Sequence, residues 1–172
     1  PLNTNREPDL SFIKGTMDAI FPHIKAGQII SLESTTYPGT TEEELKPNLE
    51  KKKLTIGEDF FLIYSPERED PGNKNSSSSL MTKLVSGETK NCLELTKNLY
   101  GSVFKNIWSL SNIKTCEMTK LYENIYRSVN IGMANEMKII CNGLNMDIYE
   151  IIKAAKTKPF GYNAFYPGPG LG

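Results

Sequence analysis

Residues 117–136 read EMTKLYENIYRSVNIGMANE, and they set the organisation of the whole chain. Lys120, Asn124 and Arg127 recur at i, i+4 and i+7, so a helix would place them on one face. Apolar side chains surround that face, with Met118, Leu121, Ile125 and Val129 on one side and Tyr122, Tyr126 and Met133 on the other. The pattern predicts a mostly buried helix whose polar face lines a cleft. A solvated polar face is the ordinary alternative.

The three polar residues of this face suit chemistry on an oxygen atom. A desolvated lysine such as Lys120 is a tunable acid or base, and its charge stabilises an alkoxide. Asn124 follows one turn later and can hold the same oxygen. Arg127 suits a carboxylate or a phosphate gripped through two N–H groups.

Upstream of this helix, short apolar segments alternate with helical ones. Strands are predicted at 27–34, 59–67, 83–88 and 104–110, and helices at 9–25, 40–52 and 88–101. A flexible loop is expected at 73–79, and a helical pattern runs from about 115 to about 156 with a break near 143–145. The alternation predicts an α/β fold with a parallel sheet, from which a long helix leads out.

Ligands of such sheets bind beyond the carboxyl ends of the strands, here at 31–39, 65–72 and 109–120. In the first segment, Ser34 and Thr35 either form an ordinary turn or direct their hydroxyls at a cofactor or a catalytic water. In the second, Glu67 and Arg68 either lie in a charged surface loop or have a function, with the carboxylate activating water beside groups that hold the substrate. The Gly/Pro-rich tail at 158–172 is either a rigid turn or backbone that approaches a ligand closely.

Bulk composition narrows the function classes. The chain has 172 residues with 20 Lys plus Arg against 20 Asp plus Glu, so its net charge indicates neither nucleic acid nor an acidic membrane surface. Cys92, Cys116 and Cys141 form no CxxC pair, so we expect packing thiols and no metal site. The apolar run at 60–64 is too short to cross a bilayer, and a cytoplasmic location is expected.

Two features indicate an incomplete chain. It starts in a polar segment without Met, and it stops in the run PGPGLG. It also contains no GxGxxG, the usual pyrophosphate-binding turn. We therefore expect an internal fragment that is inactive by itself.

Four motifs together are more specific than any one of them. The segments ESTTYPGTTEE, YSPEREDPGN, KLYENIYRSVNIGMANE and PFGYNAFYPGPGLG resemble, in order and spacing, the UDP-sugar 6-dehydrogenases. They are most similar to the branch that acts on UDP-N-acetylglucosamine or UDP-N-acetylmannosamine. The resemblance implies the C-terminal half of a Rossmann-type NAD domain at 1–114, then a central helical, dimer-forming domain and the start of a substrate loop at 115–172.

The resemblance also implies a reaction. The C6 hydroxyl of a UDP-N-acetylhexosamine is oxidised to the carboxylate in two hydride transfers to NAD, for capsule or O-antigen polysaccharide precursors. A cysteine nucleophile carries a thiohemiacetal and then a thioester, which water hydrolyses. In the family that cysteine follows PGPGxGGHC, a motif within which this sequence stops at Gly172.

Residue roles follow from the same resemblance. Lys120 is similar to the proton donor and acceptor that stabilises the oxyanion, and Asn124 to its partner on that oxygen. Thr35 resembles a hydroxyl near the nicotinamide, with Ser34 beside it, and Glu67 the carboxylate that handles the hydrolytic water. Substrate contacts are implied for Arg68, Glu69, Lys120, Asn124, Arg127 and Gly172.

One departure and two alternatives accompany this hypothesis. UDP-glucose enzymes have a second glutamate four residues after the first, whereas this chain has Pro71 there, which favours the N-acetylhexosamine branch and leaves Glu67 alone in its role. A 3-hydroxyacid or 6-phosphogluconate-type dehydrogenase would also place a lysine and an asparagine four residues apart on such a helix. A non-catalytic dimerisation fragment is the third interpretation.

Overall fold

The computed structural model describes residues 2–68 and 81–170, and the chain divides into two compact units. Unit 1 covers Pro1–Lys120 and unit 2 covers Leu121–Gly172. Each has its own cluster of buried apolar side chains, and each is described separately.

Runs of β-branched and aromatic residues build the sheet of unit 1. Its strands are β1 (Ile29–Leu32), β2 (Phe61–Tyr64), β3 (Lys83–Gly87) and β4 (Ile107–Ser109), in the spatial order β1-β2-β3-β4. β1 pairs with β2 in parallel, Ile29 opposite Phe61, and β3 pairs with β4 in parallel, Lys83 opposite Ile107. The strands predicted from the sequence are all present, with shorter bounds.

The two parallel pairs run in opposite directions, which corrects the expectation of a wholly parallel sheet. β2 and β3 are antiparallel, with Ile63 opposite Gly87 and Tyr64 opposite Ser86. A parallel neighbour needs a long crossover, usually a helix, whereas an antiparallel neighbour does not. The sequence between these two strands carries no helical pattern, which agrees with their antiparallel pairing.

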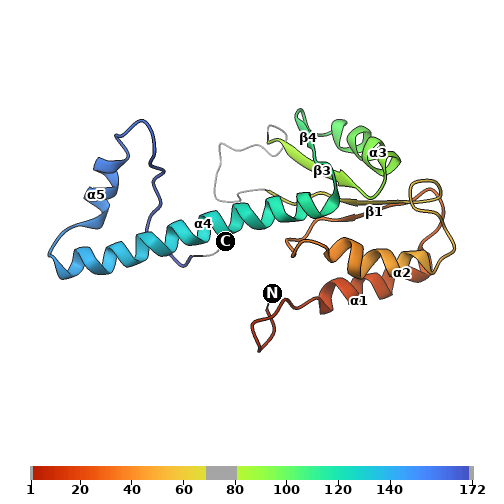
Figure 1. Ribbon diagram of the computed structural model, residues 1–172, viewed down its shortest axis with the longest axis horizontal. Coiled ribbons are helices and arrows are strands. Elements are labelled where there is room, and N and C mark those ends of the chain that lie inside the picture. The colour runs from red at the N-terminus through yellow and green to blue at the C-terminus, as the bar shows by residue number, and fades with distance from the viewer. Residues whose placement is uncertain (1, 69–80, 171–172) are drawn as a thin grey trace. The chain divides into compact units, whose positions relative to one another are not determined.

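Helices cover both faces of this sheet (Figure 1). α1 (Ser11–Ile20), which continues into the turn η1 (Phe21–His23), lies with η2 (Thr41–Leu45) and α2 (Lys46–Glu50) on one side, and α3 (Lys90–Gly101) lies on the other. Strand residues alternate accordingly. Leu32, Leu62, Tyr64 and Leu84 face the core of α1 and α2, which also includes Met17, Leu45, Leu49, Phe60, Ile113 and Cys116.

Glycine allows α3 to pack closely on the end of β3. A Cβ atom at Gly87 would lie 2.4 Å from the backbone nitrogen of Leu93, nearer than real side chains come to backbone. The Thr89 hydroxyl then caps the helix by accepting a hydrogen bond from the Cys92 amide at 3.2 Å. The end of β3 is thereby fixed against the helix that leads to β4.

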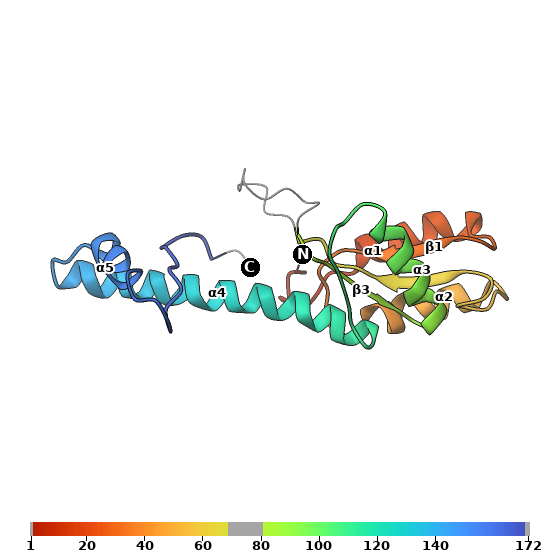
Figure 2. The ribbon, with the colours of Figure 1, turned by 90° about the horizontal axis from the view of Figure 1, so that it is seen from above.

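The long helix of the sequence prediction is α4 (Ile113–Gly143), a single uninterrupted helix that is clear in Figure 2. The predicted break is confirmed, because α4 ends at Gly143 and Asn145 adopts a left-handed φ of 55°. Asp147 caps α5 (Ile148–Ala155) by accepting from the Tyr149 amide at 2.9 Å. In unit 2, Ile148 and Ile152 of α5 pack with Cys141 in a small core.

The expectation of a mostly buried α4 is wrong for this chain. Many apolar side chains of the helix are more than two-fifths exposed, among them Met118, Tyr122, Ile125, Tyr126, Val129, Met133, Ile139 and Ile140. The reason is size: α5 and the tail supply too few residues to enclose a helix of this length in unit 2. Among the residues that the structure describes, no helix is both long and apolar enough to cross a membrane.

Candidate active site

The carboxyl ends of β1 and β2 lie at the same edge of the sheet, because these strands are parallel. Glu33 follows β1 and Glu67 follows β2, and the Glu67 amide donates to the Glu33 carbonyl at 3.2 Å. Two of the three ligand segments predicted from the sequence therefore meet. The third, at 109–120, begins at the opposite edge, since β4 runs the other way.

A buried lysine joins the two carboxylates. Lys83, the first residue of β3, is only 5% exposed. Its ammonium Nζ lies 3.3 Å from an oxygen of Glu33 and 3.8 Å from an oxygen of Glu67. The same nitrogen donates to the Pro66 carbonyl at 3.4 Å. A buried ammonium is tolerated only when it is paired and hydrogen-bonded, and these oxygens supply both conditions.

Aromatic rings complete the surroundings of this ammonium. Lys83 Nζ lies 5.1 Å from the ring centre of Tyr100 and 5.5 Å from that of Phe104. The Tyr100 hydroxyl donates a short hydrogen bond to Glu33, which Ser31 also contacts at 3.2 Å. Burial, and then the bond to Glu33, raise the pKa of Tyr100 to about 12. The hydroxyl is therefore protonated at neutral pH and acts as a donor. We name Ser31, Glu33, Glu67, Lys83 and Tyr100 the carboxyl-end cluster.

Glu67 is the member of this cluster that meets solvent. Its side chain is 58% exposed while Lys83 behind it is buried. Next to it, the Arg68 amide donates to a Glu67 oxygen at 2.7 Å, and the Arg68 guanidinium donates to the Thr82 carbonyl at 2.9 Å. The two oxygens of Glu67 face the Arg68 amide and the Lys83 ammonium, and more than half of the side chain is exposed, so water can reach this carboxylate and give up a proton to it.

The segment after Glu33 carries the predicted hydroxyls. Ser34 and Thr35 are both exposed, and the Tyr64 hydroxyl donates to the Ser34 carbonyl at 3.2 Å. Burial raises the pKa of Tyr64, so this hydroxyl stays a donor. Beyond them, Thr36 and Thr40 share a hydrogen bond of 2.5 Å and are buried. The exposed hydroxyls thus stand on a segment that is anchored on both sides.

A fully buried carboxylate, Glu117, ties this segment to the start of α4. It accepts from the Gly39 amide at 2.5 Å, the Thr41 amide at 2.9 Å and the Thr41 hydroxyl at 2.7 Å. Gly39 has a φ of 106°, a conformation that favours glycine. A carboxylate suits the first amides of the helical segment that begins at Thr41.

Sequence reasoning missed Glu33, Lys83 and Glu117 as site residues. In the sequence, Lys83 is typical of the polar end of a strand, and Glu117 is typical of a solvated charge on a helix. One signal for Glu117 was available: it stands three residues before Lys120, so it shares that side of the helix.

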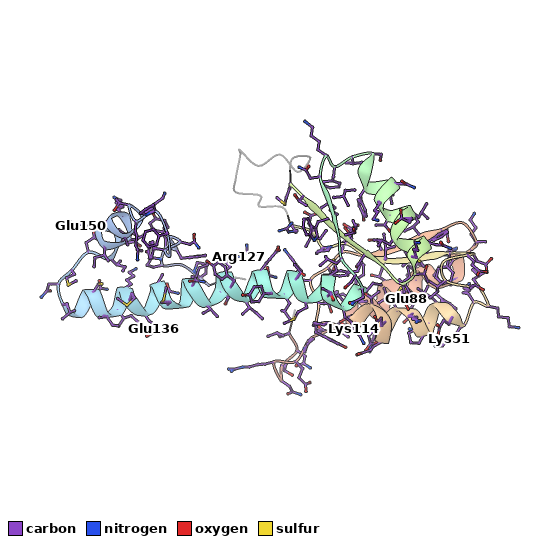
Figure 3. All side chains as sticks on the ribbon, turned by 45° about the horizontal axis from the view of Figure 1, so that its top comes forward. Lys51, Glu88, Lys114, Arg127, Glu136 and Glu150 are labelled. Carbon is purple, nitrogen blue, oxygen red and sulfur yellow. The ribbon has the colours of Figure 1, made fainter. Side chains whose placement is uncertain are left out.

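The polar residues of the opening stretch all lie in α4. Lys120 is half-buried and is the last residue of unit 1. In unit 2, the Arg127 guanidinium donates to the Asn124 side-chain oxygen at 2.8 Å, and Arg127 is exposed on the helix surface (Figure 3). Arg127 therefore orients the amide of Asn124 and keeps further N–H groups for an anion.

The tail of unit 2 packs back on α4. Asn135 donates to the Gly168 carbonyl at 2.8 Å and accepts from the Gly168 amide at 2.9 Å. Ser128 donates to the Gly170 carbonyl at 3.3 Å, and Gly170 has a φ of 70°. Upstream, Tyr126 and Phe165 meet edge to face at 5.6 Å. The Gly/Pro run is thus held by side chains of the helix that also carries Arg127.

Glu69, Pro71, Gly172 and the flexible loop expected at 73–79 lie outside the described residues. Within the described ranges, no group of three or more His, Cys, Asp or Glu side chains could hold a metal ion. Cys92, Cys116 and Cys141 are all buried, as expected of packing residues.

Comparison with known proteins assigns these features to one family. The NAD binding domain of the UDP-glucose/GDP-mannose dehydrogenase family matches residues 1–104, and the central domain of that family matches residues 114–172. The chain belongs to the UDP-glucose/GDP-mannose dehydrogenase family. The resemblance drawn from the four motifs is therefore confirmed, together with the α/β fold, the NAD-binding domain and the long central helix.

Relatives with known activity are similar along nearly the whole chain. A UDP-N-acetyl-D-glucosamine 6-dehydrogenase of Pseudomonas aeruginosa is 39% identical over 98% of this chain and 40% of its own length. A UDP-N-acetyl-D-mannosamine dehydrogenase of Campylobacter jejuni is 35% identical, over 98% and 43%. The solved structure of a UDP-N-acetyl-mannosamine dehydrogenase from Staphylococcus aureus matches with a TM-score of 0.85 at 37% identity, over 97% and 40%. The chain thus spans about two-fifths of the length of these relatives.

Proposed function

We propose that the complete protein oxidises the C6 hydroxyl of a UDP-N-acetylhexosamine to the carboxylate, with NAD as hydride acceptor. The balanced reaction consumes one sugar, two NAD⁺ and one water, and yields the uronate, two NADH and three protons. The observation that carries the proposal is the carboxyl-end cluster, in which an exposed carboxylate at the end of β2 is held by a buried lysine. Polysaccharide precursor synthesis is the use that we infer for the product.

We assign NAD to the edge of the sheet where Ser34 and Thr35 are exposed. These hydroxyls follow β1, and a cavity of about 280 Å³ beside α1 and β1 reaches Ser34. When bound, NAD supplies the hydride acceptor. Ser34 and Thr35 would contact it near the nicotinamide.

Lys120 and Asn124 act on the oxygen that reacts. We assign Lys120 the removal of the C6 hydroxyl proton and the stabilisation of negative charge on that oxygen. A preorganised amine in a water-poor site stabilises such charge more strongly than water does. Asn124, oriented by the Arg127 guanidinium at 2.8 Å, donates to the same oxygen. Arg127 binds an anionic part of the substrate, and Arg68 lines the sugar.

Glu67 serves the last step, in which water releases the product. The resemblance implies a thioester on a cysteine. The water oxygen bonds to the thioester carbonyl carbon, the carbon–sulfur bond breaks and the sulfur leaves as the thiolate. Glu67 takes the water proton. Its exposed tip and anchored backbone suit that task better than a role in hydride transfer.

We propose further that the protein forms a homodimer whose subunits contact each other through the central helical domain, residues 115–172. Exposed apolar residues along α4 support this, because their contact with a second copy removes them from water. Analytical ultracentrifugation of the complete protein tests it. A monomer at micromolar concentration contradicts the proposal.

The stoichiometry of NADH tests the proposed function. The complete protein is incubated with limiting UDP-N-acetylglucosamine or UDP-N-acetylmannosamine and excess NAD. Two NADH are expected per sugar, with the uronic acid as product by mass spectrometry. One NADH per sugar identifies a simple alcohol dehydrogenase, and no reduction with either sugar overturns the proposal.

A further inference from the structure

The buried cation of the carboxyl-end cluster has no part in the chemistry described so far. Lys83 is 5% exposed, and its ammonium reaches Glu33 at 3.3 Å, the Pro66 carbonyl at 3.4 Å and Glu67 at 3.8 Å. These three partners come from the ends of two different strands. Lys83 itself opens a third strand, where its backbone pairs with Ile107 of β4.

We propose that Lys83 is a positioning residue for the hydrolytic step: it holds the carboxylate of Glu67 in place. The inference rests on the proposed function, because it gives Lys83 its role through Glu67. Charge and geometry support it. The Lys83 ammonium lies 3.8 Å from a Glu67 oxygen, and the attraction between the two charges restricts where the carboxylate can lie.

Glu33 and Tyr100 fix the lysine in turn. Glu33 is held by the Tyr100 hydroxyl and by Ser31 at 3.2 Å, and it presents its other oxygen to Lys83. The rings of Tyr100 and Phe104 flank the ammonium at 5.1 and 5.5 Å and leave it little room to move. Lys83 carries one positive charge and lies between two carboxylates, so the three side chains together keep one negative charge. Glu67 is the carboxylate of the pair that is exposed to solvent.

A purely structural ion pair would behave differently from a positioning residue. Removing a structural pair lowers stability and slows both half-reactions alike. Removing a group that positions Glu67 slows hydrolysis alone, because the first hydride transfer does not use Glu67. The two half-reactions therefore separate the two interpretations.

The test uses Lys83→Met in the complete protein, with single-turnover NADH formation for the first step and intact-protein mass for the covalent sugar adduct. We expect the first hydride transfer to stay within a few-fold of wild type. Hydrolysis should slow on the order of 10- to 100-fold, the scale of a misplaced catalytic group, so the adduct accumulates. Lys83→Met added to Glu67→Gln should cost little more than Glu67→Gln alone. Lys83→Arg, which retains the charge, should restore part of the rate.

Lys46→Met is the matched control, since Lys46 pairs with Glu88 at 2.5 Å in the same unit, away from the cluster (Figure 3 labels Glu88). It should leave both steps unchanged. If Lys83→Met fails to fold, Lys83→Gln, which keeps a hydrogen-bond donor but no charge, takes its place. Equal slowing of both steps, or additive effects with Glu67→Gln, overturns the inference while the proposed function stands. A wild-type protein that reduces no NAD with either sugar overturns both.

Discussion

Unit 1 buries several charged side chains, whereas unit 2 exposes many apolar ones. In unit 1, charged side chains such as Lys83 and Glu117 are buried, and each is matched by partners from other elements. In unit 2, apolar side chains such as Val129 and Ile139 are exposed on a long helix. Burying a charged side chain costs free energy unless the charge is paired. The buried Lys83 and Glu117 therefore depend on the exact placement of their partners. The exposed apolar area in unit 2 is the surface that we propose a second copy covers.

A large effect on kcat is expected at Lys120, the last residue of unit 1. Lys120→Ala in the complete protein removes the charge that stabilises the reacting oxygen. The loss of one such contact is on the order of 3–4 kcal/mol, or roughly 10²–10³ in kcat, while KM changes far less. Steady-state kinetics of NADH formation measure it. Lys114→Ala is the control, because Lys114 is exposed on the same helix and pairs with Glu42 at 2.9 Å. If kcat of Lys120→Ala stays within a few-fold of wild type, Lys120 belongs to a solvated polar face.

A smaller effect is expected at Glu117, which tests whether the buried charge in unit 1 is structural. Glu117→Gln keeps the shape but turns a donor toward the amides of Gly39 and Thr41. Leaving such buried groups unsatisfied costs about 1–3 kcal/mol, so the midpoint of thermal unfolding should fall. Glu94→Gln is the control, since Glu94 pairs with Lys97 at the surface. An unchanged midpoint for Glu117→Gln would show that water replaces the lost charge.

The smallest effect is expected on the exposed helix of unit 2. Val129→Asp places a charge on the surface that we propose to be covered in the dimer. A weakening of dimerisation by about tenfold, or about 1.4 kcal/mol, is expected in sedimentation velocity. Val103→Asp is a closely matched control, because Val103 is 65% exposed and Val129 is 64% exposed. Equal behaviour of the two variants would place the dimer interface elsewhere.

Much of the fold could be predicted from the sequence because it depends on local patterns. Apolar runs marked the four strands, and helical periodicity with the Gly143–Asn145 break marked α4 and α5. The direction of β3 was not predicted correctly, since strand orientation depends on which neighbour it meets. The exposure of α4 was also missed, because a sequence pattern shows which residues avoid water but not what covers them.

The site divides in the same way. Glu67, Arg68, Ser34 and Thr35 could be named as candidates from the sequence because they follow predicted strands. Lys83 was not found, because its importance comes from side chains 50 residues before it and 17 residues after it, at Glu33 and Tyr100. Glu33, Lys83 and Tyr100 come together only in the folded chain. The roles assigned to all of these residues stay predictions until the variants are measured.

The most direct test of the account is a single measurement on Glu67→Gln in the complete protein. The substitution keeps the shape of the side chain and removes the base, which typically slows a proton-transfer step roughly 10²–10⁴-fold. After mixing with UDP-N-acetylhexosamine and NAD, intact-protein mass spectrometry should show a covalent sugar adduct that wild type and the exposed control Glu58→Gln do not retain. If Glu67→Gln forms no adduct and also loses the first oxidation, Glu67 serves binding or folding, and the carboxyl-end cluster is not the hydrolytic site.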